Sequence, residues 1–377
     1  MRRMKQVMPT RVRSHSKINL GLAIGPPRPD GFHHLSTLYQ TLALYDVVTV
    51  SAKRAAATAM TLTSNHPGVP TDQRNTAWRM VERCLERLHL HAEVNVHIQK
   101  ELPIQGGMGA GSANAAAALL GLERELGVAL PGLERLELAA TVGSDVPLFL
   151  LGGAVLGQGR GELVSPLPDL PETHCVIALP SVGVSTPQAF RDWDALLLAE
   201  AADAGEGLGK RLTGAAGTDR LEQLSLALAA PYAEPGTSGI FCESSANLDA
   251  PEKKQGSCDG SRSALQNDLA ENALLALVRT GIENDFERVV FPIHPPLHAI
   301  KRQLTGIASA ADSAPGVDLD GSALYAALSG SGSALFGLYR SSADAKAAQQ
   351  RVQAAGVKAV LTHTLPRSAY WRTMFAG

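Results

Sequence analysis

A glycine-rich segment at residues 102–116 is the strongest candidate for chemistry; it reads Leu-Pro-Ile-Gln-Gly-Gly-Met-Gly-Ala-Gly-Ser-Ala-Asn-Ala-Ala. Glycines let a backbone approach a ligand closely, because no Cβ stands in the way. The Ala- and Leu-rich stretch that follows predicts a helix from Ser112 to Leu126. The free N–H groups and positive dipole end of a helix attract anions, most often phosphate. The segment therefore predicts a phosphate-binding loop; a plain glycine turn capped by Ser112 is the alternative.

The residues of this loop exclude the common nucleotide-binding motifs. A Walker loop ends in Gly-Lys-Ser or Gly-Lys-Thr, whereas Ser112 and Ala113 follow Gly111 here. A dinucleotide-binding fingerprint requires a third glycine at the position of Ser112. The His-Arg-Asp and Asp-Phe-Gly triplets of protein kinases are absent from the sequence.

Lys17 and Asp145 are charged residues outside the loop whose neighbours suggest a site. Lys17 and Asn19 belong to a stretch with β character at 11–22, so their side chains share one face of the expected strand. Asp145 stands between small residues and an apolar run. Each has an ordinary alternative, because a lysine on a strand is usually an exposed edge charge and an aspartate beside glycine often makes a turn.

Periodic patterns predict the elements around these residues. Apolar residues at helical spacing indicate a helix over 76–90, and the alternation of Val94, Val96 and Ile98 indicates a half-buried strand. Strand, glycine loop and helix therefore follow one another. Further strands are expected at 42–50, 176–179, 335–339 and 357–365, and one more strand is expected to end at Leu328. Helices are expected near 269–280, 282–304 and 343–355.

Composition limits the class of protein. The 377 residues suggest two domains, and 34 basic against 36 acidic side chains argue against a nucleic-acid partner. The four cysteines form no CxxC pair, so we expect neither a disulfide framework nor a zinc site. We therefore expect the protein to work in a reducing compartment. No apolar core follows the basic first residues, and no apolar run is long enough to span a bilayer. We expect a cytoplasmic protein with no membrane partner, either a monomer or a homodimer.

The segment from Pro103 to Ala116 resembles the phosphate loop of the GHMP small-molecule kinase superfamily, which includes galactokinase, homoserine kinase and mevalonate kinase. Within that superfamily the chain resembles the 4-diphosphocytidyl-2-C-methyl-D-erythritol kinase family. The block Arg28–His33 is the most specific, because sister kinases lack it. The blocks that carry the resemblance occur in the family's order: Ser16–Leu20, Arg28–His33, Gly143–Pro147, Gly183–Thr186, Asn284–Glu287 and Leu328–Gly332.

The resemblance implies an α+β, two-lobed GHMP kinase fold with the active site between the lobes. The N-terminal lobe, at 1–165, would resemble ribosomal protein S5 and bind ATP. The C-terminal lobe, at 166–377, would be ferredoxin-like α/β and lie on the substrate side. The stretch at 200–265 shows no sustained period, and we interpret about 225–265 as a flexible insertion.

The resemblance also implies an activity and residue roles. The enzyme would use ATP, normally with Mg²⁺, to phosphorylate the 2-hydroxyl of its cytidine diphosphate-linked methylerythritol substrate, in the non-mevalonate isoprenoid pathway. Asp145 matches the catalytic carboxylate, which accepts or orients the hydroxyl proton, and Lys17 matches its charge partner. Ser112 would supply a metal or phosphate hydroxyl. The substrate would meet Asn19, Phe32, His33 and Phe190, with both phenylalanines stacked on the cytosine. The ATP phosphates would be held by Pro103, Gly106, Gly107, Met108, Gly109, Ala110, Gly111, Ser112 and Ala113.

The chain departs from the family pattern at a few positions. Phe32 stands where many members have Tyr, Gln105 and Ala110 replace glycines, and Ala113 replaces a second serine. Ala110 is compatible with the loop if its φ is negative.

Two alternatives stay open at this point. Another kinase of the superfamily, of mevalonate or homoserine type, would share the loop but lack Arg28–His33. A non-catalytic nucleotide sensor on the same fold would be expected to lack Lys17 or Asp145, and both are present.

Overall fold

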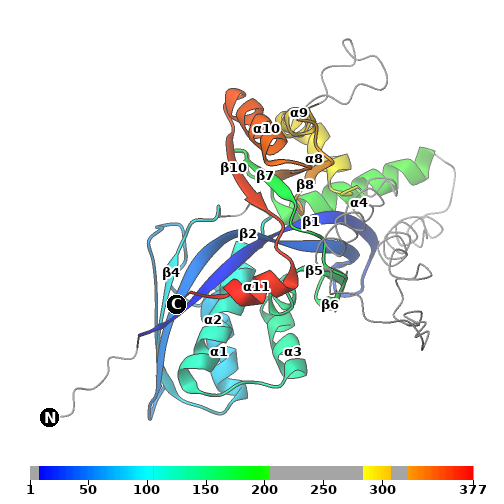
Figure 1. Ribbon diagram of the computed structural model, residues 1–377. Helices are drawn as coiled ribbons and strands as arrows, with labels where there is room; N and C mark the ends of the chain where they lie inside the picture. The colour runs from blue at the N-terminus through cyan, green and yellow to red at the C-terminus, as the bar shows by residue number, and fades with distance from the viewer. Residues whose placement is uncertain (1–7, 105, 204–282, 307–320, 377) are drawn as a thin grey trace, which may run out of the picture.

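The computed structural model describes residues 8–104, 106–203, 283–306 and 321–376 (Figure 1). The expected insertion at 225–265 and the helix near 269–280 lie outside these residues, as does Gln105. Within the described part, no helix has the length and apolar character needed to cross a membrane.

Seven strands form the first sheet, in the order β11-β1-β2-β4-β3, with β5 beside β2 and β6 beside β5. β3 and β4 run parallel, and the other pairs are antiparallel. The strands are β1 (Thr10–Pro27), β2 (His33–Arg54), β3 (Ala59–Ser64), β4 (Ala92–Gln99), β5 (Ala154–Gly159), β6 (Leu163–Pro166) and β11 (Phe375–Ala376).

β1 and β2 are longer than the sequence patterns predict. They form a hairpin that closes at the pair Pro27 and His33, where the Arg28 N–H donates to the Phe32 carbonyl at 2.6 Å. Gly31 has a φ of 81°, which a residue with a Cβ rarely adopts. The Arg28–His33 block therefore forms the tip of one long hairpin.

Four antiparallel strands form the second sheet, in the order β10-β7-β9-β8. They are β7 (His174–Leu179), β8 (Tyr325–Leu328), β9 (Leu335–Tyr339) and β10 (Lys358–His363). Helix α10 (Ser342–Ala354) connects β9 to β10, which lie on opposite sides of β7. The bounds of β9, α10 and β10 agree closely with the strand, helix and strand expected at 335–339, 343–355 and 357–365.

The helix expected over 282–304 is two helices, α8 (Glu287–Ile293) and α9 (Pro295–Thr305). His294 separates them, with φ −125° and ψ 70°. A residue before proline is disfavoured in helical geometry, so Pro295 ends α8 and begins α9.

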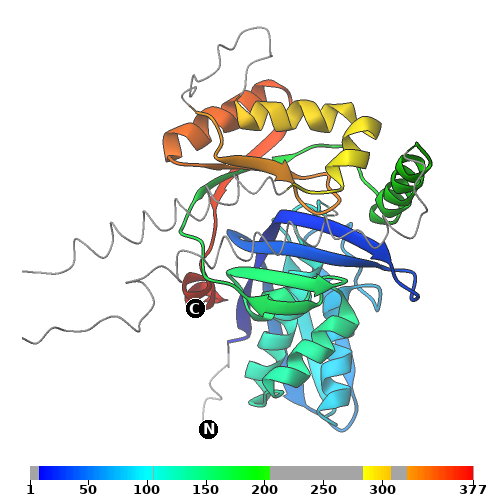
Figure 2. The ribbon, with the colours of Figure 1, turned by 90° about the vertical axis from the view of Figure 1, so that its right-hand side faces the viewer.

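The two sheets and their helices stack in four layers (Figure 2). One face of the first sheet is covered by α1 (Thr76–Arg87), α2 (Ala110–Leu126) and α3 (Gly132–Val142). The other face of β1 and β2 packs against the second sheet, whose far face is covered by α8, α9, α10 and α4 (Thr186–Asp203). Alternation along β7 produces this arrangement, because Cys175 and Ile177 face the first sheet while Val176 and Ala178 face the helices.

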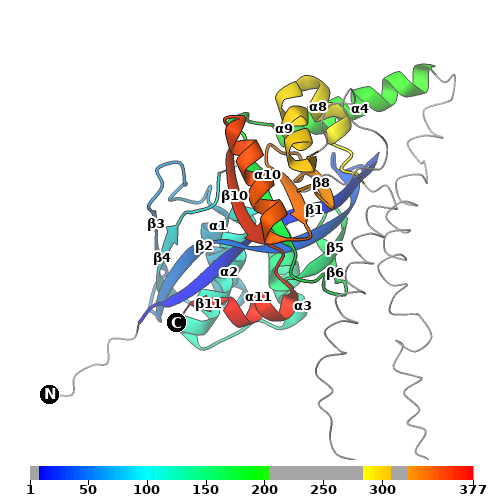
Figure 3. The ribbon, with the colours of Figure 1, turned by 45° about the horizontal axis from the view of Figure 1, so that its top comes forward.

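The end of the chain returns to the first sheet, although the expected lobe boundary places it in the second lobe. Figure 3 shows α11 (Arg367–Thr373) and β11 beside the first sheet. Arg11 pairs with Ala376, and Tyr370 is buried in the core under α1–α3, with its hydroxyl donating to the Phe149 carbonyl at 2.6 Å. Burial of the large Tyr370 side chain in this core stabilises the placement of α11 and β11 beside the first sheet, away from β10.

Candidate active site

The glycine loop needs its glycines for close contacts. A Cβ on Gly107, whose φ is 74°, would lie 2.1 Å from the Ser329 carbonyl oxygen. A Cβ on Gly109, whose φ is 69°, would lie 2.9 Å from Phe149 and 3.1 Å from the Lys17 stem. No other residue type fits both the space and the backbone conformation.

Helix α2 begins at Ala110, two residues before the predicted start, with Gly109 as its N-cap residue. Ala110 therefore adopts helical backbone geometry, which satisfies the condition of a negative φ. Ser112 lies in the first turn with its side chain partly exposed, whereas Ala113 is buried in the core beneath the loop. The first N–H groups of α2 open toward the loop, as an anion site requires.

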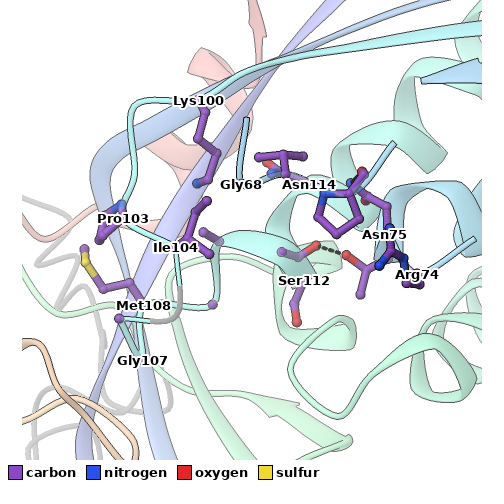
Figure 4. A pocket seen from close by; sticks show the side chains of 17 residues that line it. Gly68, Arg74, Asn75, Lys100, Pro103, Ile104, Gly107, Met108, Ser112 and Asn114 are labelled. Atoms are coloured by element: carbon purple, nitrogen blue, oxygen red, sulfur yellow. Dashed lines mark hydrogen bonds between the residues drawn. The ribbon is translucent and has the colours of Figure 1, made fainter. Parts of the chain in front are cut away.

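A cavity of about 440 Å³ lies beside the loop (Figure 4). Pro103, the stretch Gly106–Ser112 and Asn114 line one part of it. The rest of the wall has no counterpart in the sequence-based site: Gly68, Val69, Pro70, Arg74, Asn75, Thr76, Lys100 and Ile104. Asn75 caps α1 by accepting a hydrogen bond from the Ala77 N–H at 2.9 Å. An asparagine directly before the predicted helix at 76–90 is a sequence signal for a helix start, and it could have located this part of the wall.

Lys17 and Asp145, which belong to separate sequence motifs, form an ion pair with Nζ 3.3 Å from Oδ2. The Lys17 side chain is 3% exposed and that of Asp145 is 31% exposed. Lys17 also donates to Asn19 Oδ1 at 2.6 Å, and the Asn19 amide donates to Thr37 Oγ1 at 2.8 Å. Asn19 is thus buried and fixed beside the lysine, on the face of β1 that the two-residue spacing predicts.

Tyr39 is a member of the site that the sequence motifs miss. Its hydroxyl donates to Asp145 Oδ1 at 2.9 Å, and its ring lies 5.4 Å from Lys17 Nζ. Burial, together with the neighbouring Asp145 carboxylate, raises the pKa of Tyr39 well above its usual value, so the hydroxyl remains a donor.

The second lobe contributes the loop Ser329–Gly332. Ser329 Oγ donates to the Gly107 carbonyl at 3.0 Å, which docks this loop on the phosphate loop. The Asn284 amide donates to the carbonyls of Leu328 and Gly330 at 2.8 and 2.6 Å. A Cβ on Gly330 would lie 3.8 Å from Lys17 Nζ, so the two lobes meet at the lysine.

Three of the predicted substrate residues, Phe32, His33 and Phe190, lie at the hairpin tip and on α4, whereas Asn19 lies beside Lys17. His33 is buried, its Nε2 lies 2.7 Å from Asp194 Oδ1, and its ring stacks on Phe190 at 4.9 Å. Phe32 is 50% exposed, and its ring lies 4.9 Å from the Arg160 guanidinium. Phe190 also lies edge-to-face against Phe286, with ring centroids 5.0 Å apart, while Phe32 lies in the exposed turn. Stacking of both phenylalanines on the cytosine stays a prediction.

Metal binding by side chains alone has little support in the described residues. Among them, no cluster of three or more His, Cys, Asp or Glu side chains is arranged to hold an ion. The Ser112 hydroxyl on the cavity wall suits Mg²⁺ that is bound mainly by phosphate and water, since such ions take few protein ligands.

Comparisons with known proteins identify domains and relatives. The GHMP kinases N terminal domain matches residues 75–153, and the GHMP kinases C terminal domain matches residues 262–358. The chain is 33% identical over 329 residues to the 4-diphosphocytidyl-2-C-methyl-D-erythritol kinase of Solibacter usitatus, covering 87% of this chain and 81% of that protein. It is 42% identical over 192 residues to the enzyme of the same name from Streptomyces coelicolor, covering 50% of this chain and 63% of that protein.

Solved structures show the same fold. A 4-(cytidine 5'-diphospho)-2C-methyl-D-erythritol kinase superposes with a TM-score of 0.58 at 23% identity, over 94% of this chain and 98% of that chain. Homoserine kinase from Cytophaga hutchinsonii superposes with a TM-score of 0.61 at 16% identity, over 97% of both chains. The two-lobed α+β GHMP kinase fold that the resemblance implies is confirmed.

Proposed function

The chain belongs to the 4-diphosphocytidyl-2-C-methyl-D-erythritol kinase family of GHMP kinases, and we propose that it transfers the terminal phosphoryl group of ATP to the 2-hydroxyl of 4-diphosphocytidyl-2-C-methyl-D-erythritol. It is a small-molecule kinase. The observation that carries the proposal is the Lys17–Asp145 pair at 3.3 Å, placed between the phosphate loop and the Ser329–Gly332 loop. A non-catalytic sensor would be expected to lack Lys17 or Asp145, and both are present and in contact.

ATP binds in the cavity beside the loop in this proposal. The cavity has a volume of about 440 Å³, which is in the range of small-molecule sites. The phosphates lie against Gly106–Ser112, where backbone N–H groups and the dipole of α2 favour negative charge. When bound, Mg²⁺ would neutralise charge on the phosphates, with the Ser112 hydroxyl as its protein contact.

Phosphoryl transfer mainly demands positioning and stabilisation of charge. A bond forms between the substrate oxygen and the terminal phosphorus, and the bond from that phosphorus to the bridging oxygen of ADP breaks. Asp145 orients the hydroxyl and accepts its proton, while the Lys17 ammonium stabilises negative charge on the oxygen and on the transferred group. Because the Lys17 side chain is buried, its charge is screened less by water than a charge on the surface would be.

The cytidyl end of the substrate lies at the hairpin tip in this proposal, with His33, Phe190 and Phe32 around it and Asn19 nearer the reacting hydroxyl. A partly exposed aromatic cluster beside polar groups supports this assignment. We place the enzyme in the cytoplasm, as a monomer or homodimer in the non-mevalonate isoprenoid pathway.

Product analysis tests the proposed reaction. Purified protein is incubated with ATP, Mg²⁺ and 4-diphosphocytidyl-2-C-methyl-D-erythritol, with mevalonate and homoserine in parallel reactions, and masses are measured. We expect the cytidyl substrate alone to gain one phosphoryl group. Phosphorylation of mevalonate or homoserine instead would assign the chain to a sister activity, and ATP binding without any product would support a sensor.

A further inference from the structure

Two different donors hold the two carboxylate oxygens of Asp145. Lys17 Nζ lies 3.3 Å from Oδ2, and the Tyr39 hydroxyl donates to Oδ1 at 2.9 Å. We propose that Tyr39 is a positioning residue for phosphoryl transfer, which fixes the rotation of the Asp145 carboxylate so that Oδ2, beside Lys17, receives the substrate hydroxyl. This inference rests on the role of Asp145 in the proposed function.

The lysine alone leaves the carboxylate poorly fixed. Asp145 lies between α3 and the short 3₁₀ helix Pro147–Leu150 and is 31% exposed, so one side of it is open. Rotation of a carboxylate about its terminal bond is soft. The lysine ammonium is also shared with Asn19 Oδ1 at 2.6 Å. A second donor on the other oxygen restricts this rotation, because both oxygens are then tied to buried groups.

Tyr39 is itself rigidly held. Its side chain is 2% exposed, and it stands opposite Asn19 in the β1–β2 ladder, on the face that carries Lys17. The Tyr39 ring belongs to the core under the first sheet. The hydroxyl therefore reaches Asp145 from a fixed position, at no further cost in side-chain entropy.

The glycine cluster at 157–161, which phosphoryl transfer itself does not use, makes room for this tyrosine. A Cβ on Gly157 would lie 2.4 Å from Tyr39 Cε2, and one on Gly161 would lie 2.4 Å from the Tyr39 hydroxyl oxygen. Gly161 has a φ of 102°, so its backbone also favours glycine. The same Cβ would be 3.9 Å from Asp145 Oδ1, which places that oxygen against the β5–β6 turn. Oδ1 therefore has both Tyr39 and this turn beside it, and in this proposal Oδ2 receives the substrate hydroxyl.

Tyr39 contributes to the reaction only by donating a hydrogen bond to Asp145, and it transfers no proton. Its raised pKa keeps the hydroxyl protonated while Asp145 accepts the substrate proton. Oδ2 keeps a lone pair for the substrate even with Lys17 beside it, because each carboxylate oxygen accepts two hydrogen bonds.

Tyr39→Phe tests the proposal, because it removes the hydroxyl and keeps the ring. We expect kcat and the single-turnover rate to fall roughly tenfold, as for loss of a hydrogen bond to a charged group, with the KM values for both substrates within about twofold of wild type. The matched control is Tyr339→Phe, which removes a buried hydroxyl that donates to the Leu304 carbonyl at 2.8 Å in the second lobe. This control should keep the wild-type rate even if it unfolds at a lower temperature.

The same assay separates the two levels of the argument. An inactive wild-type protein overturns the proposed function. If Asp145→Asn is inactive but folded Tyr39→Phe keeps the wild-type single-turnover rate, the positioning role alone is overturned. An equal loss of rate in the Tyr339→Phe control also overturns it. Gly161→Ala provides a second variant if Tyr39→Phe does not fold: its methyl group displaces the Tyr39 hydroxyl, and an unchanged rate in that folded variant also contradicts the proposal.

Discussion

In the described part of the chain, two buried lysines pair with aspartates that differ in how fully the carboxylate is hydrogen-bonded. Asp46 is wholly buried and takes four donors: the Lys100 ammonium at 2.7 Å, the Asn114 amide at 3.2 Å, and the N–H groups of Glu101 and Leu102 at 2.8 and 2.7 Å. Asp145 is partly exposed and takes two donors, Lys17 and Tyr39.

This contrast is the one we expect between a structural carboxylate and the proton acceptor that we propose Asp145 to be. Asp46 has little acceptor capacity left, and its donors tie together β2, α2 and the chain that enters the phosphate loop. Burial lowers the pKa of Lys100, and the charge of Asp46 opposes that shift. Asp145 keeps acceptor capacity and an open side, which a group that must receive a proton requires.

The first test of this contrast is Asp145→Asn. An amide in place of the carboxylate accepts no proton, so we expect kcat to fall by roughly 10²- to 10⁴-fold. ATP affinity, measured by equilibrium titration, should stay within a few fold of wild type because the loop is untouched. Turnover at the wild-type rate would remove Asp145 from the reaction.

Asp46→Asn should act on the fold instead. Removing one partner of a buried ion pair leaves an uncompensated charge, and we expect a loss of about 3–5 kcal/mol in the free energy of unfolding, with a raised KM for ATP. Urea denaturation measures the first quantity. Glu134→Gln, which breaks an exposed pair with Arg87, is the control and should cost under about 1 kcal/mol. An equal loss in both variants would show that Asp46 is no more structural than a surface acid.

Replacing each lysine by methionine sharpens the comparison. Lys100→Met strands the buried Asp46, whereas Lys17→Met leaves Asp145 in contact with water. We expect Lys100→Met to cost about 2 kcal/mol more in stability, and Lys17→Met to lose more activity at saturating ATP. The reverse order for either measurement would contradict the division of roles.

Phe32→Ala, on the open side of the site, should have the smallest effect. Loss of a stacking ring is worth about 1 kcal/mol, so we expect the KM for the cytidyl substrate to rise roughly fivefold and kcat to change less. Steady-state kinetics with that substrate varied measures both. A larger change in kcat than in KM would argue against stacking by Phe32.

Local signals in the sequence predict much of this molecule. The glycine loop, the helix after it and the strands of the second sheet agree with the structure because they depend on backbone freedom and on period, which neighbouring residues encode. Lys17 and Asp145 are recognised through short motifs.

Contacts that depend on register escape such signals. Tyr39 stands opposite Asn19 through a ladder with bulges between His15 and Lys17 and between Asn19 and Gly21, and no local pattern sets that alignment. The same holds for Asp46, which meets Lys100 after the chain has passed through α1 and β4.

The return of α11 and β11 to the first sheet has a consequence for the order of synthesis. Arg11 and Val12 emerge early from the ribosome, but their partners on β11 emerge after every other described strand. Until then that strand edge offers unpaired N–H and C=O groups, and the hollow that receives Tyr370 stays open to water. A nascent or truncated chain without residues 367–376 is therefore exposed to edge-to-edge aggregation.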